Sequence, residues 1–316
     1  MKPHPIVYFG TPEFAVPPLE ALVGADLVPA LVVSQPARPA GRDRRLRQPP
    51  VARWAERHDI PLSQPERLSD PELQERLRAL EPAVAAVVAF GQIFPPGLLE
   101  LPSLGCVNVH ASLLPRHRGA APIQAAIAAG DEVTGVTTML MDEGLDTGPI
   151  LLRKETPIRP EERAGELAER LARLGGELLV ETVEGLAEGA IEPLPQDDAR
   201  ATYARRLKKS DGRIDWTLSA EAIERRLRAY DPWPGCFTVW EDERIKVLDG
   251  SVMSDAEAAR GVAPGTIVDL GSESVVVACG EGSALALTRV QRPGRSEVSG
   301  RDLANGLRLE VGDRFE

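Results

Sequence analysis

The fold class is decided by residues 6–13, Ile6-Val7-Tyr8-Phe9-Gly10-Thr11-Pro12-Glu13. The apolar run closed by a glycine predicts a short buried strand over Ile6–Gly10. Thr11 and Pro12 then predict the start of a helix, with threonine as the N-cap and proline at the first helical position. A buried strand that leads at once into a helix is typical of α/β proteins.

The same alternation of strand and helix continues to residue 141. Further apolar strands are predicted at Leu27–Ser34, Ala83–Phe90, Cys106–His110 and Val133–Met141. Helical patterns lie between or after them at Pro49–His58, Ser69–Leu80, Ala120–Ala129 and Glu161–Gly189, the last with a kink or break predicted at Gly175-Gly176. Because the strands are apolar almost throughout, the pattern predicts a Rossmann-like, doubly wound sheet with helices on both faces.

The character of the sequence changes after Gly189. Residues 190–206 contain few apolar side chains and predict a linker. A helix is predicted at Ser219–Ala229, followed by short strands at Phe237–Trp240, Ile245–Leu248, Thr266–Leu270, Val275–Ala278 and Ala284–Arg289. Short strands between Gly, Asp and Ser turns predict a small antiparallel, OB-like barrel. We therefore expect a catalytic domain over 1–189, a linker over 190–206 and a second domain over 207–316.

Composition sets limits on the class of protein. The 316 residues carry 37 basic and 48 acidic side chains, a net charge of −11, which argues against non-specific binding to nucleic acid or membranes. The three cysteines are far apart and form no C-x-x-C pair, so neither a disulfide framework nor a zinc site is expected. No apolar run approaches the length of a membrane span, and the start leaves no room for a targeting peptide. We expect a reduced, cytoplasmic protein.

The stretch with the most potential for chemistry is residues 106–119, CVNVHASLLPRHRG. Asn108 and His110 alternate on a predicted strand, so both side chains should lie on the same face. Asp146 follows in the glycine-rich loop MDEGLDTGP (residues 141–149). The three side chains could converge at the strand ends, where open α/β sheets bind ligands. There Asn108 could donate a hydrogen bond, His110 could transfer a proton, and Asp146 could hold the histidine charged. From these residues alone, His110 could equally be a histidine with a purely structural role.

The segment HASLLPRHRG (His110–Gly119) resembles the signature of the folate-dependent formyltransferases, with Asn108 just before it and Asp146 downstream. Further segments resemble those members of the family that act on tRNA. They are FGTPEFA (9–15), RPAGRDRRLRQPP (38–50), KSDGRIDW (209–216) and PWPG (232–235). The resemblance spans nearly the whole chain.

The resemblance implies a metal-independent transferase that moves the formyl group of 10-formyltetrahydrofolate to the α-amino group of methionyl initiator tRNA, for translation initiation. It implies a monomer with Asn108, His110 and Asp146 as catalytic residues. The implied folate-binding residues are Phe90, Gly91, Gln92, Ser112, Leu113, Leu114 and Pro115. The implied tRNA-binding residues are Arg42, Arg44, Arg45, Lys208 and Lys209.

Local basic clusters on the acidic background are compatible with one polyanionic substrate, since phosphate contacts position such a ligand. They lie within residues 38–47, 205–213 and 289–301, and each could instead be a solvated face. Three other functions stay open. Formylation of a small amine, such as an amino sugar nucleotide or glycinamide ribonucleotide, would not need the arginine-rich segment at residues 38–47. A non-catalytic RNA-binding protein needs no Asn–His–Asp set. An NAD-dependent oxidoreductase is disfavoured because the first strand ends in one glycine rather than G-x-G-x-x-G.

Overall fold

The computed structural model describes residues 5–40 and 45–316. Contacts divide the chain into two compact units. The first comprises residues 1–122, 133–157 and 168–204, and the second comprises residues 123–132, 158–167 and 205–316.

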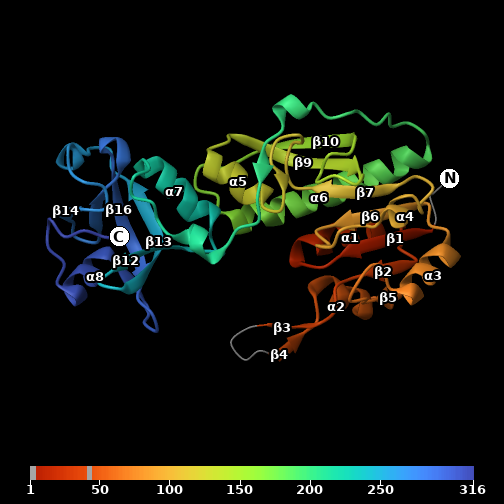
Figure 1. Ribbon diagram of the computed structural model, residues 1–316, viewed down its shortest axis with the longest axis horizontal. Coiled ribbons are helices and arrows are strands. Elements are labelled where there is room, and N and C mark those ends of the chain that lie inside the picture. The colour runs from red at the N-terminus through yellow and green to blue at the C-terminus, as the bar shows by residue number, and fades with distance from the viewer. Residues whose placement is uncertain (1–4, 41–44) are drawn as a thin grey trace. The chain divides into compact units, whose positions relative to one another are not determined.

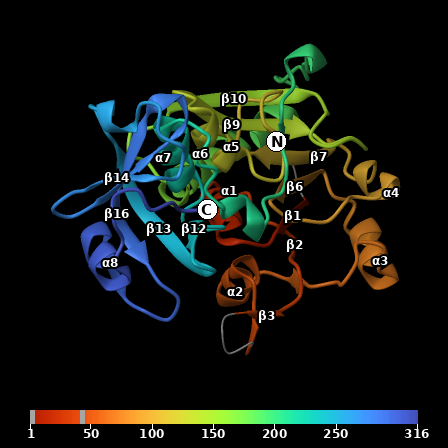
Figure 2. The same ribbon diagram turned by 60° about the vertical axis from the view of Figure 1, so that its left-hand side comes forward.

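The first unit is built on a seven-stranded mixed sheet in the order β10-β9-β7-β6-β1-β2-β5 (Figures 1 and 2). Its strands are β1 (Ile6–Gly10), β2 (Leu31–Val33), β5 (Leu62–Ser63), β6 (Val84–Val88), β7 (Cys106–His110), β9 (Val133–Leu140) and β10 (Ile150–Pro157). The five strands from β7 to β5 are mutually parallel, whereas β9 and β10 add antiparallel pairs at one edge. The order runs outward in both directions from β1, which is the doubly wound arrangement that the sequence predicts.

Helices cover this sheet, and strands such as β1 and β6 are therefore buried at every residue. They are η1 (Glu13–Ala15), α1 (Val16–Gly24), α2 (Pro50–Arg57), α3 (Pro71–Leu80), α4 (Pro96–Leu99) and α6 (Ala164–Ala187). On one face, Val7 and Phe9 of β1 form a core cluster that includes Leu73 and Leu77 of α3. The Asp70 carboxylate caps α3 by accepting hydrogen bonds from the first-turn backbone.

The predicted break at Gly175-Gly176 is wrong: α6 continues through both glycines. A Cβ on Gly175 would lie 2.9 Å from Cγ1 of Val109 in β7, and one on Gly176 would lie 2.9 Å from Cβ of Ala21 in α1. The two glycines therefore let the helix approach the sheet and α1 closely, at the expected cost in helix propensity.

Thr11 does not cap the first helix as the sequence predicts. The short η1 begins after Pro12 without a side-chain cap. The Thr11 hydroxyl instead donates to the carbonyl oxygen of Phe90, 3.2 Å away, and accepts from the backbone N–H of Gln35 at 3.4 Å. Thr11 thus links the carboxyl ends of β1, β2 and β6, which a local capping rule cannot foresee.

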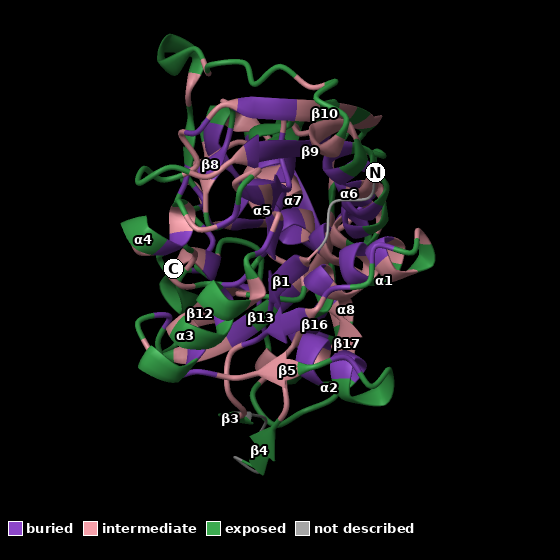
Figure 3. Ribbon diagram, turned by 90° about the vertical axis from the view of Figure 1, so that its right-hand side faces the viewer, coloured by how far each residue is buried: buried purple, intermediate pink, exposed green. Residues whose placement is uncertain are grey.

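Within the arginine-rich segment of residues 38–47, β3 (Arg38–Ala40) pairs antiparallel with β4 (Arg45–Arg47), and we call this pair the arginine ribbon. All of β4 is exposed, as Figure 3 shows, and 72% of the Leu46 surface is accessible. The exposed pair extends charged side chains away from the core of this unit.

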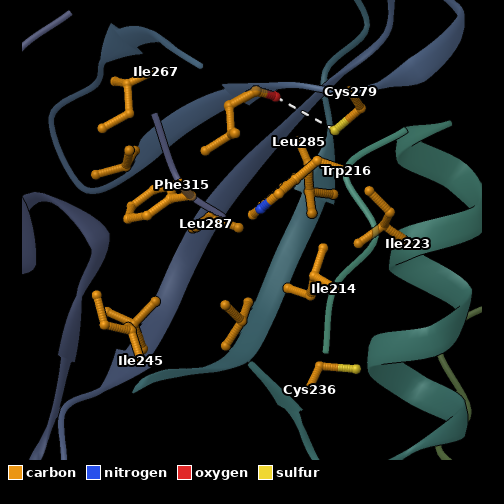
Figure 4. Packing of buried hydrophobic residues seen from close by; sticks show 14 of the residues in the cluster. Ile214, Trp216, Ile223, Cys236, Ile245, Ile267, Cys279, Leu285, Leu287 and Phe315 are labelled. Atoms are coloured by element: carbon orange, nitrogen blue, oxygen red, sulfur yellow. Dashed lines mark hydrogen bonds between the residues drawn. The ribbon is translucent and has the colours of Figure 1, made fainter. Parts of the chain in front are cut away.

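The second unit contains an antiparallel sheet in the order β12-β13-β16-β15-β14, with β17 paired to β16. Its strands are β12 (Cys236–Trp240), β13 (Glu243–Val252), β14 (Ile267–Leu270), β15 (Val275–Ala278), β16 (Ala284–Gln291) and β17 (Glu297–Ser299). Its helices are α5 (Pro122–Ala129, which starts in the first unit), η3 (Lys209–Gly212), α7 (Ala220–Ala229), η4 (Glu257–Ala259), η5 (Gly280–Gly282) and α8 (Gly300–Leu307). The core packs Trp216, Ile223, Ile245, Leu285 and Phe315 together (Figure 4).

Residues 313–316 connect the two edge strands of this sheet. Val239 of β12 and Glu316 exchange backbone hydrogen bonds in both directions. On the other edge, Ile267 of β14 donates to Asp313, and Phe315 donates to Gly265. The antiparallel sheet is confirmed, and its edges are joined through the C-terminal segment, whereas the OB-like class of the barrel stays a prediction.

Candidate active site

Strand β7 brings Asn108 and His110 to the candidate site. The strand pairs in parallel with β6 and antiparallel with β9, so that Asn108 lies beside Met139 and His110 beside Thr137. His110 is buried, with 6% of its surface exposed, whereas Asn108 is half-buried. In the part of the chain that is described, no side-chain hydrogen bond is formed by the Asn108 amide. The amide is therefore available to a ligand.

Both ring nitrogens of His110 face oxygen atoms. Nε2 lies 3.0 Å from the carbonyl oxygen of His117, and Nδ1 lies 3.6 Å from Oδ2 of Asp146. A carbonyl can only accept, so Nε2 carries a proton. The Asp146 carboxylate, which can also only accept, faces Nδ1 at 3.6 Å, just beyond hydrogen-bond distance. The predicted pairing of His110 with Asp146 thus has a geometric basis.

Asp146 is held in a left-handed backbone conformation with φ of +53°. Such a conformation is uncommon for residues other than glycine and needs support from its surroundings. Part of that support is the backbone N–H of Gly119, which donates to Oδ2 of Asp146 at 2.8 Å. The carboxylate is 15% exposed, so it remains partly accessible beside His110.

Residues 112–119, the signature loop, turn back over β9. The buried Ser112 hydroxyl donates to the carbonyl oxygen of Arg116 at 2.6 Å. Thr137 of β9 donates to the Ser112 carbonyl oxygen and accepts from the Leu114 N–H. Leu114 itself is buried against Met139 and Ile150. Of the predicted folate-binding residues in the loop, Ser112 and Leu114 therefore shape it from inside, whereas Leu113 and Pro115 are half-buried.

The second predicted folate-binding segment follows β6. The Phe90 ring is buried in the core against Phe9, and the Phe90 carbonyl oxygen accepts from Thr11 and Gln35. The Gln92 amide oxygen accepts from the Leu68 N–H. The Phe90 and Gln92 side chains therefore fix the segment. Gly91, exposed with φ of +84°, presents backbone without a side chain.

The predicted tRNA-binding residues fall into two places. Arg42 and Arg44 lie outside the described residues, and Arg45 is exposed on the arginine ribbon. Lys208 and Lys209 are exposed at η3 in the second unit. There the Asp211 carboxylate accepts from Arg205 at 2.7 Å and from the Lys208 N–H, and these hydrogen bonds lower the pKa of Asp211 to about 2.

No cysteine of this chain is suited to act as a nucleophile. Cys106, Cys236 and Cys279 are all buried and free, and burial raises the pKa of each thiol to about 12.

Over residues 5–40 and 45–316, we find no group of three or more His, Cys, Asp or Glu side chains arranged to hold a metal ion. In the same residues, no helix has the length and apolarity to span a membrane.

Three contributors to the site carry no signal in the sequence. His117 contributes its backbone carbonyl rather than its ring, and it does so from a left-handed backbone conformation with φ of +59°. Gln196 and Thr202 come from the predicted linker and contact the loops around His110 and Asp146. These contacts join residues 48 to 85 positions apart, and no local pattern in the sequence signals them.

Comparison with known proteins gives matches over both parts of the chain. Residues 6–183 match the formyl transferase family, and residues 206–308 match its C-terminal domain. The chain is 51% identical over 319 residues to the methionyl-tRNA formyltransferase of Synechococcus sp. (strain JA-3-3Ab), covering 98% of both chains. It is 50% identical to the methionyl-tRNA formyltransferase of Anaeromyxobacter sp. (strain K), covering 96% of this chain and 97% of that one.

A solved structure shares the fold at low sequence identity. It is the N-formyltransferase from Helicobacter canadensis, crystallised with folinic acid and dTDP-3-aminofucose. It has a TM-score of 0.66 and 16% identity, and the match covers 91% of this chain and 98% of that one.

Proposed function

Because the chain belongs to the formyl transferase family, we propose that it transfers the formyl group of 10-formyltetrahydrofolate to the α-amino group of methionyl initiator tRNA. The product is N-formylmethionyl-tRNA, used in translation initiation. The observation that carries the proposal is the match over nearly the full length to methionyl-tRNA formyltransferases at about half identity. The pairing of His110 with Asp146 beside the available Asn108 amide supports it from the chemistry.

Asn108 and His110 stabilise the charge that develops on the formyl oxygen when the amine attacks. The half-buried Asn108 amide can donate to that oxygen. Nε2 of His110 donates to the His117 carbonyl, whereas Nδ1 lies 3.6 Å from Oδ2 of Asp146, beyond hydrogen-bond distance, so Nδ1 is the ring nitrogen that can turn to the reacting groups while the carboxylate stays beside it. Preorganised donors of this kind act without reorganisation during the reaction. Asp146 orients the ring. When the tetrahedral intermediate collapses, the bond from the formyl carbon to the folate nitrogen breaks, His110 passes a proton to that leaving nitrogen, and the ring regains a proton from the amine nitrogen that has been formylated.

The carboxyl ends of β6 and β7 offer surfaces that suit a folate. When bound, 10-formyltetrahydrofolate supplies the formyl carbon. Half-buried Leu113 and Pro115 offer apolar contact, and the exposed Gly91 backbone can be approached closely. Ser112, Leu114, Phe90 and Gln92 support these surfaces from below. Apolar contacts and backbone groups suit the uncharged pterin and p-aminobenzoyl rings of the folate.

The tRNA is held by basic residues in both units. The exposed arginine ribbon carries Arg45, and Arg42 and Arg44 belong to the same segment of sequence. Arginine suits phosphate groups because its planar guanidinium donates two parallel hydrogen bonds. Lys208 and Lys209 extend the contact to the second domain. We assign the catalytic domain to 1–189, the linker to 190–206 and the tRNA-binding domain to 207–316, in a monomer that acts in the cytoplasm.

A direct assay tests the activity. The purified chain is incubated with 10-formyltetrahydrofolate and methionyl initiator tRNA, and formylmethionine is measured after hydrolysis of the ester. Parallel reactions contain elongator methionyl-tRNA or the amine dTDP-3-aminofucose. We expect formylation of the initiator tRNA only. Formylation of the sugar nucleotide without that of tRNA would contradict the proposal and favour the small-amine alternative.

A further inference from the structure

Gln196 uses both ends of its side-chain amide next to the candidate site. Nε2 donates to the carbonyl oxygen of Asp146 at 2.9 Å and to that of Gly148 at 2.7 Å. Oε1 accepts from Nε and Nη2 of Arg118, at 3.1 and 2.9 Å. One side chain of the predicted linker therefore connects the loop that carries Asp146 with the signature loop.

Arg118 gives this connection a rigid base. It has 1% of its surface exposed, and its guanidinium also contacts Oδ1 of Asp198 at 2.7 Å. The short strand β8 (Arg118–Gly119) pairs with β11 (Tyr203–Ala204), which belongs to the same linker. Moving the buried Arg118 guanidinium away from its partners would leave its charge unpaired inside the protein, at a high cost in free energy. Gln196 is thus held from one side by groups that cannot easily shift.

The linker also supports the other neighbour of His110. Thr202 Oγ1 accepts from the backbone N–H of His117 at 2.8 Å, and the Thr202 carbonyl accepts from the Arg118 N–H at 2.8 Å. The His117 carbonyl is the group that contacts Nε2 of His110. Both oxygen atoms that face the imidazole therefore belong to residues that the segment 196–204 holds in place.

We propose that Gln196 is a positioning residue, whose two donated hydrogen bonds hold Asp146 in its left-handed conformation with the carboxylate facing Nδ1 of His110. The proposal deepens, and rests on, the proposed function of His110 and Asp146. Its chemistry is specific to an amide. Glutamate at position 196 could still accept from Arg118 but would turn a carboxylate oxygen toward the carbonyls of Asp146 and Gly148. The contact would change from attraction to repulsion while the shape is kept.

The kinetic test compares Gln196→Glu with the control Gln74→Glu. Gln74 is also half-buried and donates from Nε2 to a backbone carbonyl, that of Leu68 at 2.7 Å, but it belongs to α3. We expect kcat to fall about 10- to 100-fold in Gln196→Glu, the usual consequence of a small misplacement of reacting groups. KM for folate and tRNA should stay within about twofold, and Gln74→Glu should retain the wild-type kcat. A raised KM with unchanged kcat in Gln196→Glu would overturn the proposal.

A double-variant cycle tests the route through Asp146. In an Asp146→Asn background, Gln196→Glu should cause little further loss of kcat, because the carboxylate that it positions is gone. Losses that multiply would show that Gln196 acts by another route and would overturn the proposal. Gln196→Ala, which adds no repulsion, repeats the cycle if the glutamate variant does not fold.

A spectroscopic test separates this proposal from the proposed function. In protein labelled with ¹⁵N-histidine, Gln196→Glu should shift the ring resonances of His110 and leave those of His58 unchanged. Unmoved His110 resonances would overturn the positioning role. Failure of the proposed function would instead appear as a wild-type protein that does not formylate methionyl-tRNA, whatever the resonances do.

Discussion

The His110 site and the arginine ribbon belong to the same compact unit but hold their polar groups in opposite ways. His110 is 6% exposed, and its nitrogens face His117 and Asp146, which are themselves held by other residues. The ribbon has only two three-residue strands, and every residue of β4 is exposed. Proton transfer requires fixed geometry, whereas binding to a polyanion requires accessible charge. The difference predicts that changes in the site lower kcat and that changes in the ribbon weaken tRNA binding.

The largest effect is expected for His110→Ala. The variant loses the group that donates to the formyl oxygen and transfers the proton, so kcat should fall by about 10²- to 10⁴-fold. KM for tRNA should change little because the ribbon is untouched. His58→Ala is the control, since His58 is exposed and stacks on Trp54. A near-wild-type kcat in His110→Ala would remove this residue from the mechanism.

Asp146→Asn should have the next largest effect. Asparagine keeps an oxygen that can accept from Gly119 but removes the negative charge that faces His110. We expect a loss of kcat of about 10²-fold throughout the neutral pH range. Asp142→Asn, which changes an exposed carboxylate of the same loop, should leave kcat unchanged. Superimposable pH–rate profiles of Asp146→Asn and wild type would disprove the coupling.

Arg45→Ala tests the ribbon by itself. We expect kcat at saturating tRNA to be unchanged and kcat/KM for tRNA to fall several-fold. The dependence of log affinity on log salt concentration should become shallower by about one unit, as expected when one phosphate contact is lost. Arg57→Ala removes an exposed arginine of α2 and serves as the control. Equal effects of the two variants would mean that the ribbon has no particular role in binding tRNA.

The smallest effect concerns the Arg205–Asp211 ion pair of the second unit. The pKa of Asp211 is lowered to about 2, mainly by the hydrogen bond from Arg205 and then by that from the Lys208 N–H. A carboxylate with a lowered pKa stabilises the folded state above its unfolded pKa of about 4, and this contribution disappears as the pH falls toward 2. Asp211→Asn should therefore lower the free energy of unfolding slightly at pH 6 and not at pH 2, as urea titrations can measure. A difference that grows toward pH 2 would reverse the assignment.

Much of the fold could be predicted because apolar runs directly mark buried strands. Strands β7 and β15 begin and end at the predicted residues. Strand β10 was missed because its exposed face carries Arg153, Glu155 and Pro157, and half-exposed edge strands lack a continuous apolar run. The glycine pair in α6 was misjudged because its close contact with β7 and α1 is tertiary.

The candidate site was predictable only in part. Alternation along β7 predicts that Asn108 and His110 share a face, because side chains of a strand alternate. The contribution of Gln196 depends on carbonyl groups 48 and 50 residues away, and a polar residue in a linker gives no sign of it. Residues that act through backbone atoms, as His117 does, cannot be predicted from the type of their side chain.

The C-terminal segment has a consequence for the order of events during synthesis. Asp313, Phe315 and Glu316 provide backbone partners for both edge strands of the second sheet, and the Phe315 ring lies in its core. A nascent chain emerges from the ribosome with its N-terminal part first. The first unit can therefore form before the second, whereas the antiparallel sheet keeps two open strand edges until residues 313–316 have emerged. Exposed edges of this kind pair readily with other chains, so this interval is when the protein is most in need of a chaperone.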